Sequence, residues 1–427
     1  MTLFYFFAAL LLLQTLISLR GGVRYLRYFR RELSAAPRPD FTPHASIIVP
    51  CRGLDQHLHE NLDAICAQSY PTFEIIFVVD SPNDPALEVV ERVRSVQRGS
   101  SGSLSTRVLV SGKAKECGQK VHNLIAGVGT ANERSEVFVF VDTDARPRPD
   151  WLRSLIAPLA DERTGAATGY RWFIPSAELT SHHKLASHLR AVWNASIASA
   201  LGANPRSNFC WGGSTAIRRA TFTELDMLKR WRGTLSDDFA LTRALQNAQL
   251  PIHFVPRCLT ATPEDCTWRE LFEFTTRQLK ITRVYAPRLW RIVLISNLLF
   301  VAIFYGGLAL TLWRLWRGLP AVALPLALVA AIFVLGSCKA LLRLRAVALA
   351  LNSERDIRRA GTISAHLFLW PLASALFLYN ALAAACSRRI RWRGINYELK
   401  SPTETVIINA SRFSDADAVD EETARRA

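Results

Sequence analysis

Val137-Phe138-Val139-Phe140-Val141-Asp142-Thr143-Asp144 is a run of five apolar residues that ends in two aspartates spaced two positions apart. The apolar part predicts a buried β-strand. A strand has no packing reason to end in carboxylates, and two carboxylates at this spacing can share a hard divalent cation. A strand-end turn with a helix cap is the alternative, because Pro147, Pro149 and Asp150 follow. The segment therefore indicates a buried strand whose end carries a metal site or a capped turn.

The surrounding sequence repeats this strand pattern. Short apolar runs such as Ala45–Val49 and Glu74–Val79 alternate, from about residue 45 to 265, with amphipathic stretches of helical spacing. Strands that are apolar on both faces indicate a mostly parallel sheet covered by helices. Such sheets bind ligands at the carboxyl ends of their strands. The sequence therefore predicts an α/β domain with a crevice beside Asp142.

A second acidic strand end lies at Asp80, which follows the apolar residues 75–79, and Asp84 comes four residues later. The sheet geometry places both carboxylates at the same crevice edge as Asp142. There they could accept hydrogen bonds from a base or a ribose. Turn chemistry accounts for Asn83, Asp84 and Pro85 equally well.

A third acidic pair, Asp237 and Asp238, opens a stretch with helical spacing of apolar residues. Helix capping and the helix dipole explain carboxylates at this position. They also suit a general base, because an acceptor hydroxyl that attacks an anomeric carbon must lose its proton. Asp238 is the candidate for that base.

Two further segments contain candidate ligand contacts. Trp211, Gly212 and Gly213 combine an aromatic ring with glycines that let the backbone approach a ligand closely, which would suit a platform for a sugar or an acceptor. A plain loop is the alternative. Lys120 could bind a phosphate or face solvent.

The composition indicates a membrane protein. Half of the 427 residues are hydrophobic, and the net charge is +16. The basic residues cluster beside apolar runs, as in residues 20–31 after the run Leu3–Leu19, which argues for membrane flanks and against nucleic-acid binding. The arginines on the C-terminal side of this run predict a retained anchor and a cytoplasmic domain after it. The eight cysteines form no CxxC pairs and fit a reducing compartment.

The C-terminal third contains three further apolar runs, Ile292–Leu312, Leu319–Ser337 and Ser364–Leu382. Lys339–Arg359 mixes leucine with arginine and suggests an interfacial helix, with a solvated helix as the alternative. One anchor and three later spans would put the C-terminus opposite the catalytic domain. The basic segment Arg388–Arg393 nevertheless looks cytoplasmic, so either one run is re-entrant or a span is miscounted. The expected organisation is an anchor over residues 1–22, a basic linker over 23–44, a cytoplasmic catalytic domain over 45–290, transmembrane and interfacial helices over 291–386, and a basic then acidic tail over 387–427.

Taken in order, these segments resemble family 2 glycosyltransferases, and among them the ceramide glucosyltransferase-like group with its bacterial relatives that act on hopanoids or other membrane lipids. The resemblance covers about residues 46–285 and the flanking membrane segments. It rests on Ser46-Ile-Ile-Val-Pro50, on Asp80 with Asp84, on Lys120 with Asn123, on Asp142-Thr-Asp144 as the DxD motif, on Trp211-Gly-Gly-Ser214, and on Asp237-Asp238.

The resemblance implies a GT-A fold, a UDP-sugar donor such as UDP-glucose, Mg²⁺ or Mn²⁺ as cofactor, and inverting transfer of one sugar to a membrane lipid hydroxyl. It also implies an integral membrane enzyme of the bacterial inner membrane with its catalytic domain in the cytoplasm. The expected site residues are Asp238 and Asp237 for catalysis, Asp142 and Asp144 for the metal, Asp80, Asp84, Lys120, Asp142, Arg277 and Lys280 for the donor, and Trp211, Gly212 and Gly213 for the sugar or acceptor.

One motif departs from the family. The final (Q/R)xxRW motif is Arg277-Gln-Leu-Lys280-Ile281 here, so the tryptophan that stacks on a sugar in processive synthases is absent. This argues against the main alternative, a processive polysaccharide synthase. The complete set of aspartates argues against a non-catalytic nucleotide-sugar-binding protein. The segment Trp392-Arg-Gly-Ile-Asn-Tyr397 resembles a WRGxxY element of related bacterial enzymes, whose role the sequence leaves open.

Overall fold

The computed structural model describes residues 2–35, 41–98, 104–176, 181–320, 322–351, 357 and 359–408. A seven-stranded sheet forms its centre, in the order β3-β2-β1-β4-β6-β5-β7. All neighbouring strands are parallel except at β6, which is antiparallel to both β4 and β5. The strands are β1 (Ala45–Pro50), β2 (Phe73–Val79), β3 (Leu104–Val110), β4 (Val137–Phe140), β5 (Ala166–Phe173), β6 (Thr215–Arg218) and β7 (Ile252–Thr262). The mostly parallel α/β domain that the sequence predicts is therefore confirmed.

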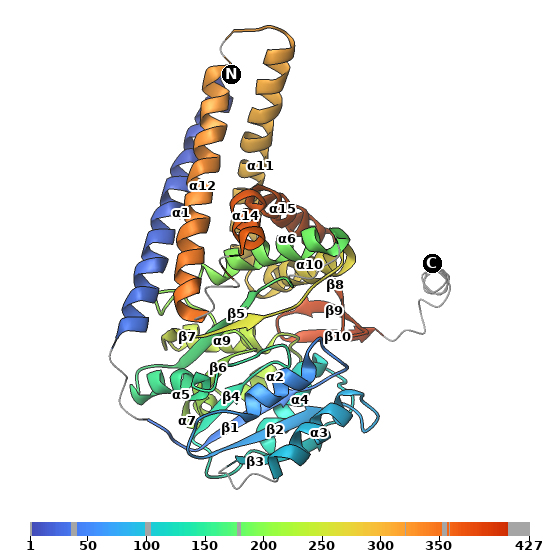
Figure 1. The fold of residues 1–427 in the computed structure, drawn as a ribbon. Helices are drawn as coiled ribbons and strands as arrows, with labels where there is room; N and C mark the ends of the chain where they lie inside the picture. The colour runs from blue at the N-terminus through green and yellow to red at the C-terminus, as the bar shows by residue number, and fades with distance from the viewer. Residues whose placement is uncertain are drawn as a thin grey trace.

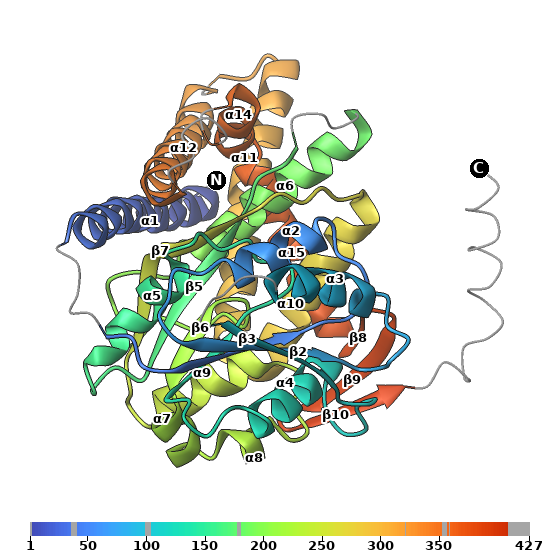
Figure 2. The ribbon, with the colours of Figure 1, turned by 60° about the horizontal axis from the view of Figure 1, so that its bottom comes forward.

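Helices cover both faces of this sheet because its central strands are apolar on both sides. On β1, Ile47 and Val49 pack into one core with α2, α3 and α5, while Ile48 packs into a second core with α4, α8 and α9 (Figure 2). The helices around the sheet, taking both faces together, are α2 (Leu58–Cys66), α3 (Ala86–Arg98), α4 (Gln119–Gly129), α5 (Trp151–Ile156), the 3₁₀ turn η1 (Ala157–Ala160), α7 (Arg219–Glu224), α8 (Met227–Trp231) and α9 (Asp237–Asn247).

Three helices are long and apolar enough to cross a membrane, namely α1 (Thr2–Ser34), α11 (Pro287–Trp316) and α12 (Ala323–Leu351). They extend away from the sheet together and share a core of their own (Figure 1). Between them and the sheet lie α6 (Ser181–Ala198), α10 (Trp268–Tyr285), α14 (Ala360–Phe368) and α15 (Trp370–Cys386).

Two of the predicted membrane segments differ in the structure. The run Ser364–Leu382 is divided between α14 and α15, which meet at an angle of 57°, and Pro371 lies in the first turn of α15, where its missing N–H costs no helical hydrogen bond. The stretch Lys339–Arg359 is not a separate interfacial helix. Its described start, up to Leu351, continues α12 without a break, because no glycine or proline separates it from the preceding apolar run. Part of its remainder lies outside the described residues.

A second sheet follows the last helix. Its antiparallel strands β8 (Arg389–Trp392), β9 (Ile395–Ser401) and β10 (Glu404–Ile408) occupy part of the segment expected to be a tail, so that expectation is wrong up to residue 408. Arg393 and Gly394 have positive φ angles of 50° and 76° and form the two-residue turn between β8 and β9. This sheet packs on α10 beside the catalytic domain (Figures 1 and 2). The acid-rich residues 409–427 lie outside the described part.

Candidate active site

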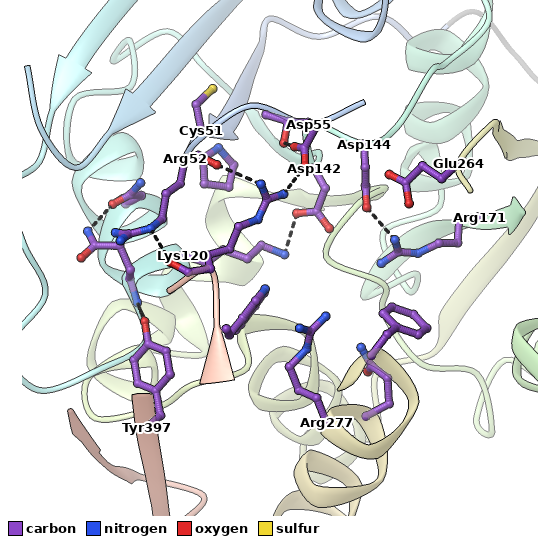
Figure 3. Close-up of a pocket in the computed structure, with 18 residues that line it drawn as sticks. Cys51, Arg52, Asp55, Lys120, Asp142, Asp144, Arg171, Glu264, Arg277 and Tyr397 are labelled. Atoms are coloured by element: carbon purple, nitrogen blue, oxygen red, sulfur yellow. Dashed lines mark hydrogen bonds and ion pairs between the residues drawn. The ribbon is translucent and has the colours of Figure 1, made fainter. Parts of the chain in front are cut away.

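A cavity of about 290 Å³ opens where β1 and β4 end, at the edge where the parallel sheet predicts its ligand crevice (Figure 3). Asp142 and Asp144 follow β4 and reach this cavity from the loop that leads to α5. The residues that line it are Pro50, Cys51, Arg52, Asp55, Gln119, Lys120, Asn123, Asp142, Thr143, Asp144, Arg171, Glu264, Phe274, Arg277, Gln278, Trp392, Arg393 and Tyr397.

Lys120, in the first turn of α4, joins two of the acidic segments. Its Nζ lies 2.7 Å from Oδ1 of Asp142 and 3.2 Å from Oδ1 of Asp237. Burial by itself would lower the pKa of Lys120, but the charges of Asp142, Asp237 and Asp238 raise it well above its ordinary value. Burial raises the pKa of Asp237 to about 6, although Lys120 acts in the opposite direction. One carboxylate that follows β4 and one that opens α9 therefore contact the same ammonium group.

Gly212 explains part of this arrangement. A Cβ atom at this position would lie 2.4 Å from Oδ2 of Asp237 and 2.5 Å from Nζ of Lys120, closer than non-bonded atoms approach. With any side chain here, the ends of Lys120 and Asp237 would have to move, so glycine allows the ion pair to lie directly against this backbone. Of the two glycines predicted to approach a ligand, Gly212 thus lies against the Lys120–Asp237 pair.

Asp144 has one carboxylate oxygen paired and one without a partner. Its Oδ2 accepts a hydrogen bond of 2.6 Å from Arg171, whereas its buried Oδ1 has no hydrogen-bond partner among the described residues. Burial raises the pKa of Asp144 although Arg171 opposes this. For Asp142, the effect of burial is outweighed by Lys120, and the pKa falls below its ordinary value. The free oxygen of Asp144 beside a second carboxylate fits a divalent cation.

No group of three or more Asp, Glu, His or Cys side chains within the described ranges could hold a metal ion. A cation bound by Asp142 and Asp144 would need its other ligands from water and from a diphosphate, as is usual for Mg²⁺. Lys120 and Arg171 pair with the same two carboxylates, so a cation at this place would have to compete with them.

Arg277, on α10, is a cation without a carboxylate partner in the described part of the chain. Its guanidinium carbon lies 5.6 Å from the ring centre of Phe274 and 5.3 Å from that of Trp392, so it sits between two aromatic rings. Burial, together with the positive charge of Arg171, lowers the pKa of Arg277 to about 10. A cation held this way in a cavity is suited to bind an anionic ligand.

The turn between β8 and β9 forms one wall of the cavity. Arg393 lies 2.6 Å from Oδ1 of Asp55 and donates a hydrogen bond of 2.9 Å to the carbonyl oxygen of Arg52. The other oxygen of Asp55 accepts a hydrogen bond of 2.6 Å from the hydroxyl of Thr143, between the two aspartates of the DxD motif. The second sheet therefore holds the loop after β1 and the DxD loop together.

Sequence reasoning missed four charged residues that line the cavity, Arg52, Asp55, Arg171 and Glu264. Asp55 and Arg171 carried no motif, although a charged residue inside the otherwise apolar strand β5 is a signal for Arg171. Glu264, in the loop between β7 and α10, lines the cavity as well. Burial, reinforced by the charge of Asp144, raises the pKa of Glu264 to about 7. The WRGxxY element resembles a family motif, but the sequence does not predict its place in the cavity wall.

Of the predicted site residues, Lys120, Asp142, Asp144 and Arg277 line the cavity. Asp237 does not line the cavity but contacts the ammonium group of Lys120, which does.

Three other predicted site residues, Asp80, Asp84 and Lys280, form contacts outside the cavity or at its wall. Asp80 is buried and paired with Arg52, which lines the cavity. Asp84 accepts hydrogen bonds of 2.9 Å from the backbone N–H groups of Gly53 and Ala86, the latter at the start of α3. Lys280 donates to the carbonyl oxygen of Arg389 at 2.7 Å. These three residues therefore support the walls of the cavity and do not line it.

The expected platform at Trp211 is not seen. Its side chain is only 5% exposed, its ring lies beneath the guanidinium of Arg171 at 5.0 Å, and Gly213 packs against the same ring. Trp211 thus positions Arg171. Asp238 does not line the cavity in this structure and accepts hydrogen bonds from Ser236 and from the backbone of Phe239 at the start of α9.

Ile281, the residue that replaces the motif tryptophan, faces away from the cavity. It is 6% exposed and packs with Tyr397 and Leu399 of the second sheet. The aromatic ring beside Arg277 is instead that of Trp392.

Comparison with known proteins agrees with this architecture. The model of glycosyl transferase family 21 matches residues 5–405. Ceramide glucosyltransferase 1 of Caenorhabditis elegans is 28% identical over 124 residues, which cover 29% of this chain and only a quarter of that protein.

Among solved structures, a mannosyltransferase from Pyrobaculum calidifontis in complex with GDP-Man and Mn²⁺ covers 89% of this chain and 98% of its own, at 18% identity and a TM-score of 0.46. Glucosyl-3-phosphoglycerate synthase from Mycobacterium tuberculosis in complex with Mn²⁺ and UDP-glucose covers 56% and 78%, at 14% identity and a TM-score of 0.34. Likenesses of this size carry no argument about substrates.

The family match extends over the three long apolar helices, the seven-stranded sheet and the second sheet as far as the start of β10. It confirms the resemblance found in the sequence motifs and sets aside the non-catalytic alternative. The chain belongs to glycosyltransferase family 21 and is a glycosyltransferase.

Proposed function

We propose that this enzyme transfers a single sugar from a UDP-sugar, such as UDP-glucose, to the hydroxyl group of a membrane lipid, with inversion at the anomeric carbon. The observation that carries the proposal is the ammonium of Lys120 between Asp142 and Asp237, at 2.7 and 3.2 Å. This contact brings the DxD loop and the start of α9 to one site, in a chain whose three long apolar helices fit a membrane protein.

The donor diphosphate would occupy the space between the DxD loop and the arginines of the opposite wall. Asp142 and Asp144 would hold a divalent cation, Mg²⁺ or Mn²⁺, which neutralises the departing diphosphate. Arg277 has no carboxylate partner in the described residues, and Arg393 is 36% exposed at the cavity rim, so both guanidinium groups are available to phosphate oxygens. Trp392 would keep Arg277 in place by stacking on it.

Asp80 and Asp84 would act on the nucleotide side of the site. Asp80 fixes Arg52 at the cavity wall, and Asp84 holds the loop after β1 through the N–H of Gly53. Their effect on donor binding would therefore be indirect.

The acceptor hydroxyl needs a base, and we assign this role to Asp238 with Asp237 beside it. Asp238 is half-buried at the start of α9, and its charge acts on Lys120. Glu264 is a second candidate, because it lines the cavity and its raised pKa of about 7 suits a group that takes up a proton near neutral pH.

Single transfer is favoured over polymer synthesis. The cavity of about 290 Å³ is small, and the described chain has three long apolar helices, or up to four if the bent pair counts as one span. A polymer would need a continuous path through the membrane.

The enzyme would lie in the inner membrane of a bacterium with its catalytic domain in the cytoplasm. Because Arg393 contacts Asp55, β8 and β9 lie on the same side as the catalytic domain. Three spans, with α14 and α15 as a bent pair that returns to the same side, satisfy this requirement. The five arginines within residues 20–31, after the first apolar run, support the cytoplasmic orientation of the catalytic domain.

The test is an assay of the purified full chain in detergent with UDP-glucose, Mn²⁺ and a membrane lipid extract. A single new glycolipid together with released UDP is expected. Long sugar polymers would support the processive alternative, and hydrolysis of UDP-glucose without any glycolipid would contradict the lipid acceptor.

A further inference from the structure

A second cavity, of about 130 Å³, lies where α1 and α12 run side by side next to the end of α6. It shares no residue with the active-site cavity. Its lining consists of Ser18, Gly21, Gly22, Tyr25, Ser199, Lys339 and Arg343. A Cβ at Gly22 would lie 3.2 Å from Cγ of Lys339, whereas one at Gly21 would meet nothing within 4 Å. The two glycines thus let the Lys339 side chain lie against α1 and leave the cavity open beside it.

The cavity carries two positive charges, those of Lys339 and Arg343, and no carboxylate of the described residues pairs with either of them. Lys339 donates a hydrogen bond of 2.6 Å to the hydroxyl of Ser18, and one guanidinium nitrogen of Arg343 lies 3.3 Å from Nδ1 of His366. Two positive charges in a largely buried place are unfavourable unless an anion accompanies them.

Two residues that line this cavity have buried hydrogen-bond donors without a partner in the described structure. Arg343 and Tyr25 are each only 4% exposed. Nε of Arg343 and the hydroxyl of Tyr25 have no hydrogen-bond partner in the described structure. Buried polar groups of this kind are normally satisfied. The cavity therefore offers a guanidinium, an ammonium and a hydroxyl to a ligand with several acceptor oxygens, which is the chemistry of a phosphate.

The position of the cavity along the helices indicates where such a phosphate would come from. Its lining begins at Ser18, where the apolar run of α1 ends and the arginines at positions 20, 24 and 27 begin. This transition marks the level of the lipid headgroups on the side of the catalytic domain. Basic pockets between helices at this level bind anionic headgroups. We propose that this cavity binds the phosphate of an anionic membrane lipid.

The bound headgroup would contact a part of the catalytic domain. Arg343 touches His366, and the ring of His366 stacks on that of Trp172 in β5, with centres 5.4 Å apart and an angle of 9°. Trp172 follows Arg171, the partner of Asp144. Ser199, just after α6, lines the cavity too. A lipid phosphate bound in this cavity would therefore hold the membrane helices and the catalytic domain together. This effect does not depend on which donor and acceptor the enzyme uses.

The experiment uses the full chain in nanodiscs made of phosphatidylcholine alone or with added phosphatidylglycerol, and measures the thermal midpoint together with lipid adducts by native mass spectrometry. Phosphatidylglycerol should raise the midpoint and remain bound. Lys339→Gln should weaken this binding about tenfold, since one charge-assisted hydrogen bond is lost. Arg345→Gln removes an exposed charge from the same helix and should leave the binding unchanged.

Equal stabilisation by both lipid compositions would overturn the proposal, as would equal retention of phosphatidylglycerol by the wild type and Lys339→Gln. Inorganic phosphate, added at matched concentration without anionic lipid, should have little effect. If it stabilises the protein as much as the lipid does, the ligand is a soluble phosphate and the proposal fails. If Lys339→Gln does not fold, the comparison of lipids on the wild type decides.

Discussion

Replacing Lys120 with methionine tests the arrangement at the centre of the site. The substitution keeps most of the apolar length of the side chain but removes the charge between Asp142 and Asp237. The buried carboxylate of Asp237 and the half-buried carboxylate of Asp142 are then left without their cation. Removing one partner of a buried ion pair typically costs about 3–5 kcal/mol. At roughly 2–4 °C per kcal/mol for a domain of this size, the thermal midpoint should fall by about 10 °C.

The pH dependence of this loss is specific. In the wild type the pKa of Asp142 is lowered, so its pairing stabilises the fold above its ordinary pKa and is lost as the pH falls through the lowered value. Without Lys120 the pKa values of Asp142 and Asp237 both rise, and protonation relieves the unpaired charges in acid. The destabilisation should therefore be largest above pH 7 and shrink toward pH 4.

Thermal unfolding of the wild type and Lys120→Met in detergent, measured from pH 4 to pH 8, checks this. Lys113→Met is the matched control, because Lys113 is an exposed lysine just before α4, and it should behave as the wild type. A difference between Lys120→Met and the wild type that is small or constant over this range would refute the ion-pair geometry.

Asp142→Ala should weaken UDP binding in the presence of Mn²⁺ much more than in its absence, as measured by calorimetry, and equal weakening would argue against a metal ligand. Asp238→Asn should retain UDP binding and lose turnover, whereas full turnover in this variant together with its loss in Glu264→Gln would move the base to Glu264. If Glu264 is the base, kcat should rise as the pH increases through about 7, because the carboxylate must be ionised to accept a proton. Gly212→Ala should destabilise the protein by about 1–3 kcal/mol through overpacking against Lys120 and Asp237, and an unchanged midpoint would contradict the close approach.

The parts of the fold that have a regular pattern of apolar residues can be predicted from the sequence. The buried strands β1, β2 and β4 follow from apolar runs in the sequence, and the abrupt ends of the runs at β2 and β4 mark the acidic residues after them. Of the site residues with a motif, Lys120, Asp142, Asp144 and Arg277 line the cavity, whereas Asp80, Asp84, Trp211 and Asp238 do not.

Other features depend on contacts far apart in the chain, which no local pattern reports. Asp55 is linked to Arg393 across more than three hundred residues, and only the folded chain places them together. Trp211 looked like an exposed platform because an aromatic residue beside glycines has the same sequence signature whether it is buried or open. Ile281 is likewise buried by the second sheet, and no local sequence pattern shows that this sheet covers it.

The central claim is that Asp142 and Asp144 hold a divalent cation together with the donor diphosphate in the cavity that Lys120 and Arg277 line. A crystal of the full chain grown with UDP and Mn²⁺, measured at the manganese absorption edge, tests it most directly. The anomalous density should show manganese within about 2.5 Å of a carboxylate oxygen of Asp142 or Asp144, with the diphosphate beside it. Manganese and nucleotide bound elsewhere, with Lys120 and Arg171 still paired to both aspartates, would contradict the claim.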